Sequence, residues 1–154
     1  MKYTFLWVSK TQTKAIKLLE TDFLKRINHF AKASIIEVKE SPLKSPEEKS
    51  AKEAEAVLKK LPQNAYYILL DEIGKEYTSK AFSQRIEKLE FQGKTHVVFL
   101  IGGAYGHGQA VRQIADESLA ISKMTFTHEM IRPFLLEQVY RAHMILKGTG
   151  YHHD

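Results

Sequence analysis

Five apolar runs, separated by polar or amphipathic segments, limit the folds that are open to this chain. The central runs are apolar at almost every position, which is typical of parallel strands buried on both faces. Because strands alternate with helical segments, we expect an α/β domain with a mainly parallel sheet covered by helices on both faces. The expected strands are 3–8, 33–38, 66–70, 96–101 and 118–122, and the expected helices are about 11–28, a segment from about 46, and about 79–91, 108–117 and 127–147.

The length of 154 residues fits a single domain spanning 1–154, with no internal repeat or linker. No apolar run approaches the roughly 18 residues of a membrane span, and the N-terminus becomes polar too soon for a signal peptide. Since the sequence contains no cysteine, disulfides and thiolate metal sites are excluded. We therefore expect a cytoplasmic domain without a membrane partner.

Positive charge is concentrated near the N-terminus. Residues 1–30 hold six Lys and Arg against two Asp and Glu, and so carry four of the five net positive charges of the chain. On the expected helix, lysines share one face and residues such as Phe23 and Ile27 share the opposite face. A stripe of lysines suits a polyanion such as a nucleic acid, and the alternative is an ordinary solvated face. The candidate nucleic-acid contacts on this stripe are Lys10, Lys14, Lys17 and Lys25.

The third, fourth and fifth expected strands each end in an unusual segment, namely LLDEIGK (69–75), IGGAYGHG (101–108) and AISKMTF (120–126). Ligands of open α/β sheets bind outside the carboxyl ends of the strands, so we expect the three segments to form one pocket. The glycines match neither phosphate fingerprint, because Val111 stands at the third glycine of the dinucleotide pattern and no P-loop lysine follows. The expected ligand is therefore neither a Rossmann-bound dinucleotide nor a P-loop triphosphate.

The expected C-terminal helix, 127–147, carries apolar residues on every side. A helix of this kind is buried all round, but a terminal helix covers the sheet with only one face. We expect a second copy of the chain, in a twofold homodimer, to cover the rest. The alternative is a helix wedged deeply within its own domain.

No motif supports a metal site or a hydrolytic nucleophile. The segment HEMIR begins like the zinc-protease motif, but Arg132 stands where that motif has its second histidine. The seven histidines show no ligand spacing, and there is no nucleophile elbow.

Four stretches resemble one known family: LLDEIGKEYTS, FLIGGAYG, LAISKMTFTHEMIRPFLLEQVYRAHMI and GYHHD. They resemble the RlmH family of SPOUT-class methyltransferases, which methylate N3 of a pseudouridine in 23S ribosomal RNA. The resemblance spans the whole chain and is most specific from Leu69 onward. It implies an α/β domain with a trefoil knot near the C-terminus, S-adenosylmethionine as methyl donor without a metal, and a homodimer. It also implies 23S rRNA, in the large subunit or the assembled ribosome, as substrate.

The resemblance also implies which residues contact the methyl donor. Glycines permit close approach, and backbone amides and carbonyls can read an adenine edge without a phosphate clamp. The donor contacts carried over are Leu70, Gly102, Gly103, Gly106, Ile121, Ser122, Lys123, Met124, Thr125 and Phe126.

Arg132, Arg141, Tyr151 and His152 match family positions near the mouth of the donor pocket. The resemblance implies that Arg132 binds RNA phosphate and that the other three act on a flipped base. Arg141 would stabilise negative charge on a uracil carbonyl, and His152 would do the same or accept the N3 proton. The alternatives are an ordinary helical ion pair between Arg141 and Glu137, and a solvated His152.

The sequence departs from the family pattern at two positions. Pro133 replaces an aliphatic residue and is expected to kink the long helix, and His107 replaces a leucine and is expected to alter the pocket wall. Two other functions remain open at this point. One is a ribosome-binding factor with a vestigial pocket, and the other is a small-molecule α/β enzyme with an incidental basic helix.

Overall fold

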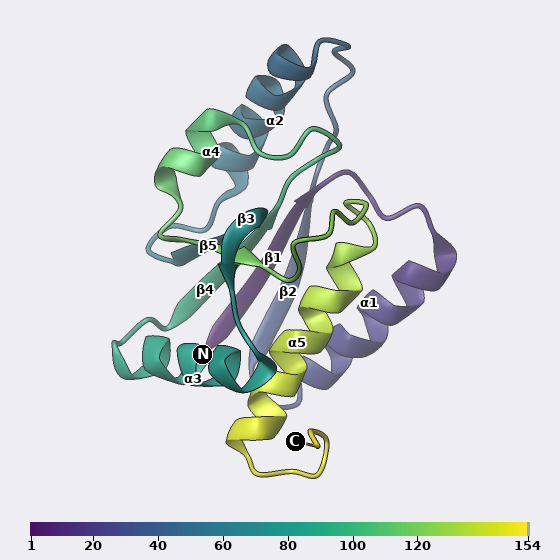
Figure 1. Ribbon diagram of the computed structural model, residues 1–154. Coiled ribbons are helices and arrows are strands. Elements are labelled where there is room, and N and C mark those ends of the chain that lie inside the picture. Colours follow the sequence, from purple (N-terminus) through teal and green to yellow (C-terminus); the bar gives the residue numbers. More distant parts are fainter. Residues whose placement is uncertain (154) are drawn as a thin grey trace.

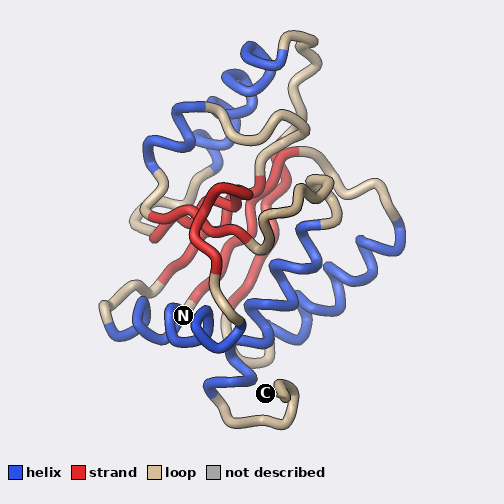
Figure 2. The backbone as a smooth tube through the Cα atoms, viewed as in Figure 1, coloured by secondary structure: helices blue, strands red, loops and turns tan. Residues whose placement is uncertain are grey.

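The computed structural model describes residues 1–153 and confirms the α/β architecture. Its five strands form one fully parallel sheet in the order β2-β1-β4-β3-β5. Figure 2 shows these strands between two groups of helices. The strands are β1 (Lys2–Val8), β2 (Lys32–Val38), β3 (Tyr66–Glu76), β4 (His96–Ile101) and β5 (Glu117–Ala120). The helices are α1 (Lys14–Ile27), α2 (Pro46–Lys60), α3 (Ser79–Phe91), α4 (Gln109–Ile114) and α5 (Ile131–Leu146).

Both faces of the sheet are covered by helices, as the apolar runs predicted. Side chains alternate along β1, so that Phe5 and Trp7 point into a core shared with α1, α3 and α5. Leu6 and Val8 point into a second core, which α2 and α4 close on the opposite face. Figure 1 shows the two groups of helices on their separate sides. This arrangement leaves the carboxyl ends of the strands accessible between the layers.

The third strand is longer than predicted. Leu119 of β5 pairs with both Leu70 and Lys75, so residues 71–74 bulge out of the sheet edge. Gly74 permits this bulge, because a Cβ there would lie 2.7 Å from the carbonyl carbons of Ser118 and Leu119. The bulge places the acidic side chains of Asp71 and Glu72 beside the carboxyl edge of the sheet.

The last helix starts later than predicted, at Ile131 instead of residue 127. Pro133 is therefore the third residue of α5, in the first turn, where a backbone amide has no partner within the helix. The expected kink inside the helix is thus wrong. The segment 121–130 stays non-helical and crosses the carboxyl ends of the strands.

Helix α5 packs against α1 and α3. Leu135, Leu136 and Val139 are fully buried, whereas Met130 and Phe134 each remain 42% exposed. The all-round burial that the sequence predicts is therefore met only in part within a single chain. The trefoil knot stays a prediction. No helix within residues 1–153 has the length and apolarity of a membrane span.

Candidate functional site

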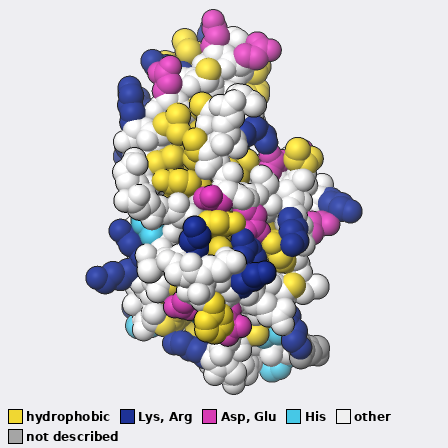
Figure 3. Space-filling view, turned by 90° about the vertical axis from the view of Figure 1, so that its left-hand side faces the viewer, with side chains coloured by type: hydrophobic (Ala, Val, Ile, Leu, Met, Phe, Trp, Pro, Cys, Tyr) yellow, Lys and Arg dark blue, Asp and Glu magenta, His cyan; other side chains and the backbone are white. Residues whose placement is uncertain are grey.

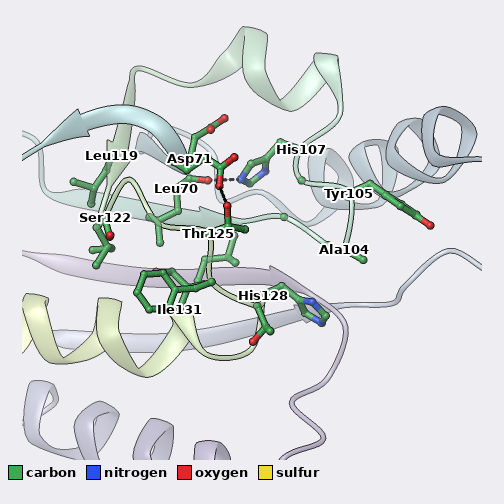
Figure 4. Close-up of a pocket in the computed structure, with 18 of the residues that line it drawn as sticks. Leu70, Asp71, Ala104, Tyr105, His107, Leu119, Ser122, Thr125, His128 and Ile131 are labelled. Carbon is green, nitrogen blue, oxygen red and sulfur yellow. Dashed lines mark hydrogen bonds between the residues drawn. The ribbon is translucent and has the colours of Figure 1, made fainter.

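A pocket of about 640 Å³ lies at the carboxyl edge of the sheet. Its three walls are the end of β3 with its bulge (70–72), the glycine segment (101–107) and the segment after β5 (119–131), as Figure 4 shows. The prediction that three strand ends meet in one cavity is confirmed. The volume falls within the range of about 300–1,000 Å³ that is usual for small-molecule sites.

The first two walls are joined by Arg112 and His107. Arg112, from α4, forms an ion pair with Asp71 and donates to the carbonyl of His107. The Nε2 of His107 lies 3.0 Å from the carbonyl oxygen of Leu70. Burial lowers the pKa of His107 to about 4, so at neutral pH the ring is uncharged and donates this hydrogen bond. The histidine that departs from the family pattern therefore fixes the pocket wall.

Neighbouring groups in the same wall lower the pKa of Asp71. Burial works against ionisation of this carboxyl, but the backbone amide of Ile73 and the guanidinium of Arg112 outweigh it and lower the pKa. Asp71 is therefore ionised at neutral pH, and its charge is matched by Arg112.

The glycines of the second wall are required by packing inside the protein. A Cβ on Gly102 would lie 2.5 Å from the carbonyl group of Gly106, and Gly106 itself has a φ of 76°. A Cβ on Gly103 would lie 2.7 Å from a carboxylate oxygen of Glu53, a buried residue of α2. Burial raises the pKa of Glu53, which also accepts a hydrogen bond from the amide of Ser41. Sequence reasoning did not single out Glu53.

The third wall carries most of the donor contacts expected after β5. Thr125 donates a hydrogen bond to the carboxylate of Glu72 and so joins this wall to the first one. Lys123 turns away from the cavity, since it is 82% exposed and pairs with Glu76 at 3.7 Å. The expected residues that do line the pocket are Leu70, Gly102, Gly103, Gly106, Ile121, Ser122, Met124, Thr125 and Phe126.

Arg132 is fully buried, which corrects its expected role as an RNA contact. Its guanidinium donates to the carbonyl of Val8 at 2.8 Å and to Thr11 at 2.7 Å, while Nε donates to the carbonyl of His128 at 2.9 Å. The side chain also lies over the Trp7 ring. These contacts hold the third wall against the end of β1. They occupy the guanidinium of Arg132, so it is not available to bind RNA phosphate.

Glu129 makes a second connection between the third wall and α1. Its two carboxylate oxygens accept hydrogen bonds from the amides of Gln12 and Thr13, at 2.7 and 3.1 Å. These amides precede the first turn of α1, where unpaired donors and the helix dipole favour a negative charge. The pocket wall and the lysine-bearing helix are thus joined directly.

Arg141, Tyr151 and His152 come together at the other end of α5. Glu137 accepts hydrogen bonds from Nε of Arg141 at 2.9 Å and from the hydroxyl of Tyr151 at 3.2 Å. The guanidinium lies 4.8 Å from the centre of the Tyr151 ring, and its Nη1 is 3.3 Å from Nδ1 of His152. The ion pair with Glu137, considered as an alternative role for Arg141, is present. It holds the cluster together.

This C-terminal cluster (Glu137, Arg141, Tyr151 and His152) does not line the pocket. Ile131 lines the pocket, and Arg141 lies ten residues further along α5, or about 15 Å at 1.5 Å per residue. Figure 1 shows the C-terminus at the end of α5 remote from the carboxyl ends of the strands. Within one chain, pocket and cluster are therefore separate.

The lysine stripe is accessible. Lys10, Lys14, Lys17 and Lys25 are all exposed, and Lys17 is shared between Glu20 and Glu37. On the side of the molecule seen in Figure 3, in contrast, acidic and basic side chains are interspersed.

The whole chain matches a family of known proteins. Residues 1–152 match the family model described as "Predicted SPOUT methyltransferase". The chain belongs to the SPOUT methyltransferases. It is 43% identical to the ribosomal RNA large subunit methyltransferase H of Trichlorobacter lovleyi, over 99% of this chain and 100% of the relative. It is 40% identical to the protein of the same name from Geobacter metallireducens, over the full length of both.

A solved structure agrees with the fold of this SPOUT methyltransferase. The crystal structure of a probable methyltransferase from Bordetella pertussis Tohama I matches with a TM-score of 0.58. The match covers 92% of this chain and 95% of that chain, at 10% sequence identity. At that identity the likeness concerns the fold alone.

Several residues that shape the site of this SPOUT methyltransferase were not predicted from its sequence. Glu53, Glu72, Arg112 and Glu129 all act by joining segments that are distant along the chain. Glu72 lies inside a predicted site segment, and Arg112 and Glu129 lie just after two others, whereas nothing in the sequence points to Glu53. Within residues 1–153, no group of three or more His, Cys, Asp or Glu is arranged to hold a metal ion.

Proposed function

We propose that this enzyme transfers a methyl group from S-adenosylmethionine to N3 of a pseudouridine in 23S rRNA, in the large subunit or the assembled ribosome. The observation that carries the proposal is the cavity formed by the three segments to which the sequence resemblance assigns the donor contacts. The names of the full-length relatives support large-subunit rRNA as the substrate class. A ribosomal substrate would also keep the enzyme in the cytoplasm.

The residues of the pocket fit this donor. Leu70, Ile101 and Ile121 offer apolar surface, and the glycine segment offers backbone groups without a phosphate clamp. When bound, S-adenosylmethionine supplies an electrophilic methyl group on a positively charged sulfur. Residues of all three walls would hold the nucleoside. Lys123 is the expected contact that fits least well, because its side chain leaves the cavity.

The C-terminal cluster suits the acceptor base. N3 of the base must lose its proton, and the guanidinium of Arg141 would stabilise the negative charge that develops on a neighbouring carbonyl. His152 would accept the proton, either directly or through water. Burial and the nearby Glu137 raise the pKa of Tyr151, so this residue stays a neutral phenol that can stack on an extruded base. Glu137 positions both Arg141 and Tyr151.

The separation of pocket and cluster supports a homodimer. Neither end of a rigid helix can move to the other, so the cluster can reach a donor pocket only in a second subunit. Exposed apolar side chains at the start of α5 are available for such a contact. Phe126, Met130 and Phe134 are 37–42% exposed, and the rings of Phe126 and Phe134 lie 5.3 Å apart. We infer a twofold dimer in which each pocket is completed by the partner's cluster.

The lysines of α1 would then bind the RNA backbone around the site. The direct test is methyl transfer from labelled S-adenosylmethionine to ribosomes lacking the modification, with the modified base identified by mass spectrometry. We expect N3-methylated pseudouridine in 23S rRNA. Donor binding without transfer to free 23S rRNA, subunits or ribosomes would contradict the proposal and favour a non-catalytic rRNA-binding factor.

A site formed by the pocket of one subunit and the cluster of its partner can be tested by mixing two inactive variants. Gly102→Val distorts the pocket wall, because its side chain would run into the backbone of Gly106, and Arg141→Ala removes the guanidinium of the cluster, so each homodimer should be inactive. After mixed refolding, half of the dimers would be heterodimers with one intact composite site, and about a quarter of wild-type activity should return. If mixing restores nothing although heterodimers form, pocket and cluster do not act across subunits.

A further inference from the structure

The pocket carries a net negative charge. Of the lining residues in the described part of the chain, the acidic and strongly basic side chains are Asp71, Glu72 and Arg112. His107 and His128 also line the pocket, but both are neutral, because burial lowers their pKa values, helped for His128 by the charge of Arg132. Asp71 and Arg112 pair with each other. Glu72 is left as the charge that no lining cation balances.

Glu72 is held at the mouth of the pocket. It lies on the bulge 71–74, and its carboxylate accepts a hydrogen bond from the hydroxyl of Thr125 in the opposite wall. The dashed line that ends at Thr125 in Figure 4 marks this hydrogen bond. A cavity of about 640 Å³ is roughly 11 Å across, which is comparable to the Debye length of about 10 Å at 0.1 M salt. Any charge on a bound ligand is therefore felt by Glu72.

The methyl donor and its product differ by one charge. S-adenosylmethionine carries a positive sulfur, which S-adenosylhomocysteine lacks, while the ammonium, carboxylate, ribose and adenine groups are common to both. We propose that Glu72 is a specificity-determining residue, through which the pocket prefers the cationic donor to the demethylated product. The inference rests on the proposed function, because it requires that the pocket binds this donor. It adds an electrostatic reason for the product to leave after transfer.

The size of the effect follows from Coulomb's law. At about 8 Å, with an effective dielectric constant of roughly 40 to 80 for an exposed rim, removal of one charge should weaken donor binding about two- to sixfold. Product binding should stay nearly constant. If Glu72 instead bound the ribose or the ammonium group, both ligands would lose affinity together, because they share those groups.

The test is calorimetric titration of the full-length enzyme with each ligand separately, so that catalysis is not needed. Glu72→Gln removes the charge with almost no change in shape, and Glu72→Asp retains it. Glu76→Gln is the matched control, since Glu76 lies on the same strand and pairs with Lys123 but does not line the pocket. We expect the donor-to-product affinity ratio to fall about two- to sixfold in Glu72→Gln only, and the wild-type ratio to shrink as salt rises.

An unchanged donor-to-product affinity ratio in Glu72→Gln would overturn the inference and leave the proposed function in place. This holds whether the variant binds both ligands equally more weakly or binds both as the wild type does. If the wild-type enzyme bound neither ligand, the inference and the proposed donor would fail together.

Discussion

Gly102→Ala tests how closely the pocket wall is packed. The new Cβ would lie 2.5 Å from the carbonyl carbon and oxygen of Gly106, whereas ordinary contacts between carbon atoms are about 3.5–4.0 Å. The two segments would have to separate by about 1 Å, and the obstructing atoms are backbone and not a flexible side chain. The hydrogen bond from the amide of Gly106 to the carbonyl of Gly103, at 3.0 Å, resists this movement.

Such overpacking typically costs about 1–3 kcal/mol in the free energy of unfolding, which for a domain of this size lowers Tm by roughly 2–4 °C per kcal/mol. We expect this loss in urea denaturation, together with at least a tenfold weaker affinity for S-adenosylmethionine in calorimetric titration. Gly150→Ala is the control, because a Cβ there meets nothing within 4 Å. Unchanged stability and unchanged donor affinity in Gly102→Ala would refute the close packing of this wall.

Two further predictions concern buried ionisable groups. Arg132→Met should lower the free energy of unfolding by about 3–5 kcal/mol, because it leaves buried carbonyls unpaired. It should leave the salt dependence of RNA binding unchanged. A stable variant whose RNA binding depends less on salt would restore Arg132 as a phosphate contact. Burial lowers the pKa of both His107 and His143 to about 4. Below about pH 6.5, the ordinary pKa of histidine, both side chains therefore take up protons when the protein unfolds. Stability should fall between about pH 6.5 and 4, by up to roughly 1.4 kcal/mol per pH unit for each histidine, in denaturation series at several pH values. In His143→Gln the free energy of unfolding should fall less steeply with falling pH. A slope equal to that of the wild type would contradict the lowered pKa of His143.

The architecture was predictable because each element is specified locally. Helix α3 was expected at 79–91 and is found at Ser79–Phe91, where Thr78 caps its N-terminus by accepting a hydrogen bond from the amide of Ala81. The buried strands could be read from continuous apolar runs. These signals do not depend on what the segments later contact.

Two of the predictions that failed depend on contacts between distant segments. The extension of β3 past residue 70 requires pairing with β5, and only Gly74 hints at it in the sequence. Arg132 looks like a surface cation in the pattern of its own helix. It is buried because the end of β1 offers a carbonyl and the loop that follows offers the hydroxyl of Thr11, 124 and 121 residues away in sequence. Periodicity within one helix carries no information on such partners.

The C-terminal cluster raises a different question, because sequence resemblance groups its residues with the mouth of the donor pocket. Once α5 is known to be continuous from Ile131 to Leu146, its geometry alone places Arg141 about 15 Å along the helix from the pocket residue Ile131. A continuous helix behaves as a rod, so no loop movement within the chain can remove that separation. If pocket and cluster serve one reaction, a second subunit must supply one of them. The length of α5, more than its apolar pattern, is therefore the strongest argument for a dimeric enzyme.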